Sequence, residues 1–237
     1  MLALRLIVSL SPLALALLIW RKRRDAARAA RANVPWLKAM RDQLAQRQHD
    51  DAQPPKLPVE LLPHIVYGDR KCAADHSRLR ELGVTHVLNC AGAAGDVRRD
   101  GAALDGVSYL TLEADDEEGY PMIRRHLGAA RAHIRAAEAG GGRCLVHCVA
   151  GVNRSGVLCA AEYMLRARVP VLEAVARCRR ARGRAFLWNE SFQEQLVVLA
   201  REEGLLGARP EGYDDTPLAP KCAKPKPAAA LAALARL

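Results

Sequence analysis

Strand-type and helix-type patterns alternate between residues 58 and 204, and this alternation limits the fold more than any other feature of the sequence. Short runs rich in β-branched or apolar residues lie at 64–67, 85–90, 107–112 and 144–147. Helical patterns lie between or after them, at 74–82, 122–139, 155–168, 171–182 and 189–200. Such alternation predicts an α/β domain with a central, mostly parallel sheet flanked by helices.

The first 24 residues combine an apolar run with a basic cluster. Residues 2–20 are mostly apolar, and Arg21, Lys22, Arg23 and Arg24 follow directly. About 20 apolar residues allow a helix to span a bilayer, and basic residues beside such a run tend to stay in the cytosol. We therefore expect residues 1–24 to be a membrane anchor that leaves the rest of the chain facing the cytosol. Two alternatives stay open: an organelle-targeting presequence, since residues 26–32 are rich in Ala and Arg, and a disordered tail.

The remaining flanks differ in composition from the central region. Residues 25–57 favour helix and end in a proline-rich stretch, which predicts a basic helical stalk and linker that does not pack into the domain. Residues 205–237 are rich in Pro, Ala and Lys, and they are predicted to be disordered. The domain itself is thus expected at 58–204.

The formal net charge is +10, and most of it belongs to the N-terminal arm, where residues 1–55 contain ten Lys and Arg but four Asp and Glu. Such an arm suits an anionic membrane surface, and we expect no nucleic-acid binding by the globular part. The seven cysteines are odd in number and irregularly spaced, which argues against a disulfide framework and for a reducing compartment. Because no Cys-x-x-Cys pair or His-rich cluster is present in the sequence, no metal is expected.

One segment, residues 147–156, has a pattern typical of an anion-binding site. It is predicted to be the end of a strand, a seven-residue loop and the first turn of a helix. Such a loop directs backbone N–H groups at one point, where the helix dipole adds positive charge. Gly151 allows a tight turn, and the guanidinium of Arg154 can hold two oxygens of a phosphate group. The predicted substrate-binding residues are Val149, Ala150, Gly151, Val152, Asn153 and Arg154.

Cys148, at the start of this loop, is the predicted nucleophile. The positive field of the loop favours its thiolate, which is the reactive form of cysteine. Ser155 can donate a hydrogen bond to the sulfur, and His147 is expected to hold the loop by hydrogen bonds rather than to transfer protons. A buried cysteine beside a surface arginine is the competing interpretation, but it leaves the mid-loop glycine and the following Ser-Gly pair unexplained.

Residues 147–155 match the His-Cys-(x)5-Arg-Ser/Thr signature of the protein tyrosine phosphatase superfamily, and the region 58–204 resembles its dual-specificity branch. Further matches lie at 67–69, 83–90 and 113–116. The resemblance implies a phosphocysteine intermediate, no metal or other cofactor, and an aspartate on a separate loop that acts as general acid and then as base. The family pattern places this residue at Asp116, with Asp115 as the alternative.

The resemblance also implies the substrate, which is phosphotyrosine and phosphoserine or phosphothreonine on proteins, so a phosphorylated protein is the expected partner. The loop side chains of Val149, Ala150, Val152 and Asn153 are uncharged, whereas phosphoinositide phosphatases of the superfamily tend to carry lysines there. A phosphoinositide or RNA 5′-phosphatase and a phosphoprotein-binding pseudophosphatase remain the alternatives.

Two further features stay open. Cys90 is either a core cysteine or, as in some relatives, the partner of Cys148 in a disulfide that forms on oxidation. A basic run either meets acidic residues beside the phosphorylated site of the substrate or forms a solvated helix face; it comprises Arg177, Arg179, Arg180, Arg182 and Arg184.

Overall fold

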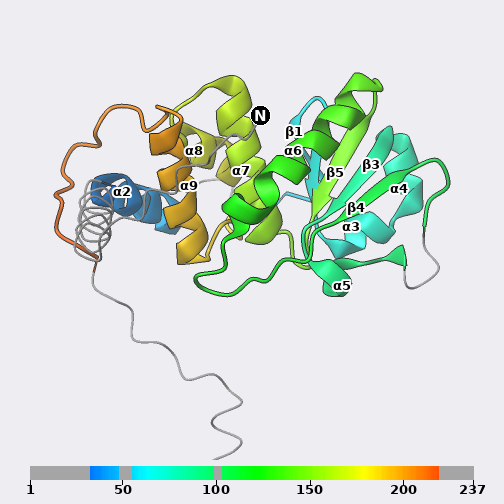
Figure 1. Ribbon diagram of the computed structural model, residues 1–237, viewed down its shortest axis with the longest axis horizontal. Helices are drawn as coiled ribbons and strands as arrows, with labels where there is room; N and C mark the ends of the chain where they lie inside the picture. Colours follow the sequence, from blue (N-terminus) through cyan, green and yellow to red (C-terminus); the bar gives the residue numbers. More distant parts are fainter. Residues whose placement is uncertain (1–32, 48–54, 99–102, 219–237) are drawn as a thin grey trace, which may run out of the picture. The chain divides into compact units, whose positions relative to one another are not determined.

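The computed structural model of the protein describes residues 33–47, 55–98 and 103–218 (Figure 1). Within them lies a five-stranded sheet in the order β1-β2-β5-β3-β4. The strands are β1 (Val59–Leu62), β2 (Ile65–Gly68), β3 (Val84–Asn89), β4 (Ser108–Thr111) and β5 (Arg143–His147). β1 runs antiparallel to β2, and the other neighbouring pairs are parallel. The predicted α/β class with a mostly parallel sheet is therefore confirmed.

Helices cover both faces of this sheet (Figure 1). The short helices α3 (Arg70–Ala74) and α4 (His76–Glu81) lie against one face, and the longer α6 (Met122–Ala139) and α7 (Arg154–Ala167) lie against the other. The helices α8 (Val171–Arg182) and α9 (Glu190–Glu202) pack on α7. One more short helix, α5 (Gly92–Gly95), follows β3.

Alternate side chains of the central strands supply two cores. Val66, Val87 and Leu145 are buried in one cluster with residues of α3 and α4. Successive side chains of a strand point to opposite faces. The core on the α6–α7 side therefore takes their buried neighbours Tyr67, Leu88 and Val146.

The carboxyl ends of β2, β5 and β3 lie side by side. Gly68 of β2 and Asn89 of β3 both pair with His147, the last residue of β5. Loops that leave the carboxyl ends of neighbouring parallel strands meet at one edge of the sheet, where α/β proteins commonly bind ligands. The predicted phosphate-binding segment leaves β5 at this edge.

The helix α2 (Val34–Ala45) corrects one expectation. We expected residues 25–57 to form a stalk that does not pack into the domain, and this is wrong for residues 34–45. Met40 is fully buried, Arg41 Nη2 lies 3.1 Å from Glu190 Oε2, and Gln43 Nε2 donates to the Leu172 carbonyl at 3.1 Å. The helix packs onto the domain because Trp36 and Met40 lie about one helical turn apart in the sequence and form an apolar stripe.

The start of the predicted disordered tail is also ordered. Leu205 is buried. Its N–H donates to the Ala200 carbonyl at 2.6 Å, and its carbonyl accepts from Val171 N at 2.9 Å. The Tyr213 hydroxyl donates to Asp42 Oδ2 at 2.8 Å. The prediction of disorder is therefore wrong for this stretch, while residues 219–237 lie outside the described residues, as does the predicted anchor at 1–24. Within the described ranges, no helix combines the length and apolarity needed to cross a membrane.

Candidate active site

The loop from Cys148 to Arg154, called the phosphate loop below, joins β5 to α7. Its carbonyl groups are held by donors from four other segments of the chain. Val149 O accepts from Arg70 N (3.1 Å), Ala150 O from Arg182 Nη2 (3.0 Å), Gly151 O from both Tyr67 OH (2.9 Å) and Arg182 Nε (2.7 Å), and Val152 O from Leu187 N (3.1 Å).

These anchors determine where the N–H groups of the loop point. The carbonyl and the N–H of one planar trans peptide unit point in opposite directions. Because the carbonyls are turned outward to their partners, the adjoining N–H groups turn inward, toward the N-terminus of α7. Inward N–H groups at a helix N-terminus form an anion-binding nest. Several N–H donors directed at one point can bind the three non-bridging oxygens of a phosphate group.

Gly151 is the position in this loop that admits no side chain. Its φ is +61°, in the left-handed region that favours glycine. A Cβ atom at this position would lie 2.5 Å from the carbonyl oxygen of Gly68, well inside van der Waals contact. The close approach of the loop to the end of β2 therefore depends on glycine.

Cys148 lies at the base of the nest, with 1% of its surface exposed. The hydroxyl of the fully buried Ser155 donates a hydrogen bond to Cys148 Sγ at 3.1 Å. A hydroxyl that donates to sulfur stabilises any negative charge that develops there. The structure thus brings together the predicted nucleophile and its predicted donor.

His147 is buried beside the nucleophile. Burial lowers the pKa of its imidazole to about 4, so the ring is neutral near pH 7. Its Nδ1 lies 3.2 Å from the Cys148 carbonyl oxygen, and because a carbonyl only accepts, Nδ1 carries the proton. A neutral, buried ring that donates to the main chain suits the predicted role in holding the loop.

Arg154 begins α7 and connects the phosphate loop to the acidic segment 113–121, called the acid loop below. Its Nη1 donates to the Ala114 carbonyl at 3.2 Å, and its Nε lies 3.8 Å from Asp116 Oδ2. The side chain is 13% exposed, so the guanidinium is largely shielded from water. Both groups expected to act on the phosphoryl group, Arg154 and Asp116, therefore lie together.

Two amides hold the carboxylate of Asp116. Asn153 Nδ2 donates to Oδ2 and Asn189 Nδ2 donates to Oδ1, each at 3.2 Å. No contact of this kind joins Asp115, which is exposed, to the phosphate loop in the described part of the chain. The geometry favours Asp116 over Asp115 as the general acid.

The acid loop is also fixed to the N-terminus of α9. Glu118 accepts hydrogen bonds from Glu190 N (3.0 Å) and Ser191 N (2.9 Å), two main-chain groups of the first helical turn. Gln195 of the same helix donates to Tyr120 O at 2.8 Å. A carboxylate is favoured there because the helix dipole and free N–H groups attract negative charge.

Several of these residues were not identified from the sequence as parts of the site. The sequence left Arg182 as either a contact for acidic substrate residues or part of a solvated face, and the structure adds a role that neither named, since its guanidinium holds two carbonyls of the phosphate loop. Asn189 caps α9 by accepting from Phe192 N, and it also holds Asp116. Glu118 carried no expected role of its own.

Cys90 follows β3, and its N–H donates to the carbonyl of His147 at 2.8 Å. The thiol is fully buried, and burial raises its pKa well above the usual value. Its sulfur is a free thiol, like those of the other described cysteines. A core cysteine fits these facts, and the redox role remains an untested prediction.

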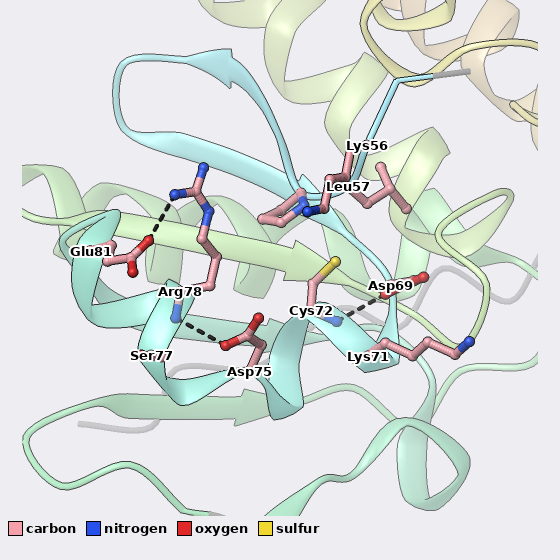
Figure 2. Close-up of a pocket in the computed structure, with 10 residues that line it drawn as sticks. Lys56, Leu57, Asp69, Lys71, Cys72, Asp75, Ser77, Arg78 and Glu81 are labelled. Carbon is pink, nitrogen blue, oxygen red and sulfur yellow. Dashed lines mark hydrogen bonds and ion pairs between the residues drawn. The ribbon is translucent and has the colours of Figure 1, made fainter. Parts of the chain in front are cut away.

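A cavity of about 800 Å³ lies beside α3 and α4, and it does not include the predicted catalytic residues. Figure 2 shows that two of its carboxylates cap these helices: Asp69 Oδ1 accepts from Cys72 N at 2.9 Å, and Asp75 Oδ1 accepts from Arg78 N at 3.0 Å. These two aspartates therefore have structural roles. In the described ranges, no group of three or more His, Cys, Asp or Glu side chains could hold a metal ion.

Comparison with known proteins identifies the family of this chain. Residues 66–202 match the family model described as dual specificity phosphatase, catalytic domain. The chain belongs to the dual-specificity phosphatase family, and the predicted resemblance is confirmed. The phosphate loop, Asp116 and α9 all lie within the matched region.

Individual relatives and structures support the same assignment. The chain is 37% identical over 142 residues to dual specificity protein phosphatase 26 of Bos taurus, covering 60% of this chain and 66% of that protein, just under two thirds of its length. It is 36% identical over 148 residues to dual specificity protein phosphatase 13B of Homo sapiens, covering 61% of this chain and 73% of that protein. The crystal structure of human DUSP28 superposes with a TM-score of 0.56 at 26% identity, over 64% of this chain and 98% of that one.

Proposed function

We propose that the protein is a cysteine-dependent phosphatase that hydrolyses phosphate esters on phosphorylated proteins. One observation carries this proposal above all: Cys148 Sγ lies at the base of a loop whose carbonyls are turned outward, with Arg154 and Asp116 beside it. Nucleophile, anion site and acid are then present together.

The first step transfers the phosphoryl group to the protein. The Cys148 thiolate attacks phosphorus while the loop N–H groups and the free donors of Arg154 bind the non-bridging oxygens. The ester P–O bond breaks, and Asp116 gives its proton to the leaving oxygen. The products of this step are the dephosphorylated residue and a phosphocysteine.

The second step regenerates the enzyme. Asp116, now a carboxylate, takes a proton from a water molecule whose oxygen attacks phosphorus. The S–P bond breaks, inorganic phosphate leaves, and the electron pair returns to Cys148 as thiolate. The Ser155 hydroxyl stabilises this leaving group because it already donates to the sulfur at 3.1 Å.

Two lines of support favour a protein as the substrate. The relatives are themselves named protein phosphatases. The side chains of the phosphate loop between Cys148 and Arg154 carry no charge, so they offer no extra binding to a polyphosphorylated lipid head group. Membrane attachment through residues 1–24 is a separate proposal, supported by the apolar run and the basic cluster that follows it.

The test replaces the nucleophile while keeping its shape. Cys148→Ser should reduce kcat/KM on an aryl phosphate and on a phosphopeptide to less than a few per cent, because a serine hydroxyl is hardly ionised near neutral pH. Cys144→Ser is the matched control, since this buried cysteine of β5 lies outside the phosphate loop. Substantial activity in the Cys148→Ser variant would overturn the cysteine mechanism.

A further inference from the structure

Trp188 is an exposed aromatic residue attached to the phosphate loop. In the described part of the chain, three large apolar side chains are exposed: Val149 (41%), Trp188 (62%) and Val198 (43%). Two of the three belong to the catalytic edge, because Val149 lies in the phosphate loop and Trp188 N donates to Asn153 Oδ1 at 2.7 Å. Tryptophan is usually well buried, so this exposure needs an explanation.

The main chain on both sides of Trp188 is held firmly. Leu187 is fully buried, donates to the Val152 carbonyl at 3.1 Å, and has φ +53°, a conformation that a residue with a side chain rarely adopts. On the other side, Asn189 is buried, donates its N–H to Asn153 Oδ1 at 3.1 Å and holds Asp116 through its side chain. These anchors hold the main chain of Trp188 beside the phosphate loop, and its side chain is exposed rather than in the core.

The preceding residue strengthens this support. Phe186 is fully buried and packs edge-on against Tyr67, with ring centroids 6.5 Å apart and the planes at 77°. Tyr67 in turn donates to the Gly151 carbonyl. The segment that carries Trp188 is therefore built onto the phosphate loop, and a rigid aromatic residue in such a place is suited to bind a ligand at low entropic cost.

The chemistry of the ester decides which ligand fits an indole here. In phosphotyrosine the ester oxygen bears an aromatic ring, which presents an apolar face just outside the phosphate site. In phosphoserine and phosphothreonine the main chain follows after one carbon, so no comparable apolar face exists. Asn153, which accepts from Trp188 N, and the groups bonded to it and to the next residue along the chain, Asp116 and Asn189, are polar.

We propose that Trp188 is a specificity-determining residue that packs against the ring of phosphotyrosine and favours it over phosphoserine and phosphothreonine. This inference rests on the proposed phosphatase function. Aromatic pairs gain energy beyond simple burial. Trp188 thus supplies to an aryl ester a contact that an alkyl ester does not make.

The experiment compares two peptides of identical sequence that differ only in phosphotyrosine or phosphothreonine. In the full chain, Trp188→Ala should lower kcat/KM for the phosphotyrosine peptide about tenfold. The value for the phosphothreonine peptide should change less than about twofold. Trp188→Phe should restore most of the loss, because it keeps an aromatic face. Val198→Ala is the matched control, since Val198 is also an exposed apolar residue but lies on α9 rather than in or beside the segment bonded to Asn153.

The outcomes separate this inference from the function on which it rests. An equal loss for both peptides, or no loss for either, in an otherwise active protein would overturn the role of Trp188 alone. Absence of wild-type turnover on both peptides would overturn the phosphatase assignment as well. A thermal unfolding curve of the Trp188→Ala variant that matches the wild type establishes that the fold is intact, and Trp188→Gln repeats the test with a larger polar side chain.

Discussion

The carbonyl of Gly151 offers a quantitative test of how the phosphate loop is held. It accepts two hydrogen bonds, from Tyr67 OH at 2.9 Å and from Arg182 Nε at 2.7 Å. Either donor alone leaves the carbonyl satisfied, whereas removal of both leaves a buried acceptor without a protein partner. The two substitutions Tyr67→Phe and Arg182→Met should therefore be strongly non-additive.

The magnitudes follow from the contacts. Tyr67→Phe keeps the buried ring and removes one hydrogen bond, which should cost about 1 kcal/mol of unfolding free energy. Arg182→Met keeps the apolar stem but removes charge-assisted bonds to Ala150 O and Gly151 O, which should cost about 2 kcal/mol. In the double variant the orphaned carbonyl adds a desolvation penalty, so the total should exceed the sum of the single effects by about 1–2 kcal/mol.

Urea unfolding of the wild type, both single variants and the double variant measures this coupling. The variants should rank in the same order when kcat/KM is measured. A peptide unit whose carbonyl loses its partners can rotate, and its N–H then points away from the phosphate. Arg180→Met is the control, since Arg180 is exposed on the same helix. Additivity within about 0.5 kcal/mol would refute the reasoning, because it would mean that water or a relaxed loop satisfies the carbonyl equally well.

Two further predictions concern the acid loop and the buried histidine. Glu118→Gln should lower kcat for alkyl phosphates several-fold and for p-nitrophenyl phosphate much less, because a poorly placed Asp116 matters most when the leaving oxygen needs a proton. Asp115→Asn is its control and should leave kcat unchanged. A loss of kcat in Asp115→Asn but not in Glu118→Gln would indicate that Asp115 is the general acid. Below pH 6.5 the unfolded chain protonates His147 while the folded chain, with the pKa of this group lowered to about 4, does not. The contribution of His147 to the free energy of unfolding is therefore fully present above pH 6.5. It is lost as the pH falls from 6.5 to 4, by up to about 3 kcal/mol. Urea midpoints at pH 7 and pH 4.5 should show this loss, and an equal pH dependence in His147→Gln would contradict it.

The central strands and long helices could be predicted from the sequence because their burial leaves a local pattern. β3 and β5 are short apolar runs, and α6 has apolar residues at helical spacing with a glycine at its end. β1 was missed because four residues after a proline-rich stretch give too little pattern to separate a strand from a loop. α2 was predicted as a helix, but its basic composition hid the stripe formed by Trp36 and Met40 that packs it onto the domain.

The residues proposed to take part directly in the reaction could be identified from the sequence because most of them also form a local pattern. Cys148, Arg154 and Ser155 lie within one short segment, so their spacing alone implies the nest. The residues that hold the nest come from other segments, and nothing local distinguishes them. Arg182 is one of several arginines on α8, and Arg179 of the same helix is fully buried while Arg180 is exposed. The difference arises from tertiary packing, which sequence periodicity does not resolve at the end of a helix.

Asn153 shows why the chemical type of a loop residue matters as much as its lack of charge. Its Oδ1 accepts from Trp188 N and Asn189 N, while its Nδ2 donates to Asp116 Oδ2. An amide combines an acceptor with two donors on one short side chain. An aspartate here would accept from the main chain but repel Asp116, and a serine has a single hydroxyl and a shorter reach. The phosphate loop, the acid loop and the segment of Trp188 are therefore joined at one side chain, so a change at this position should disturb anion binding, acid placement and substrate contact together.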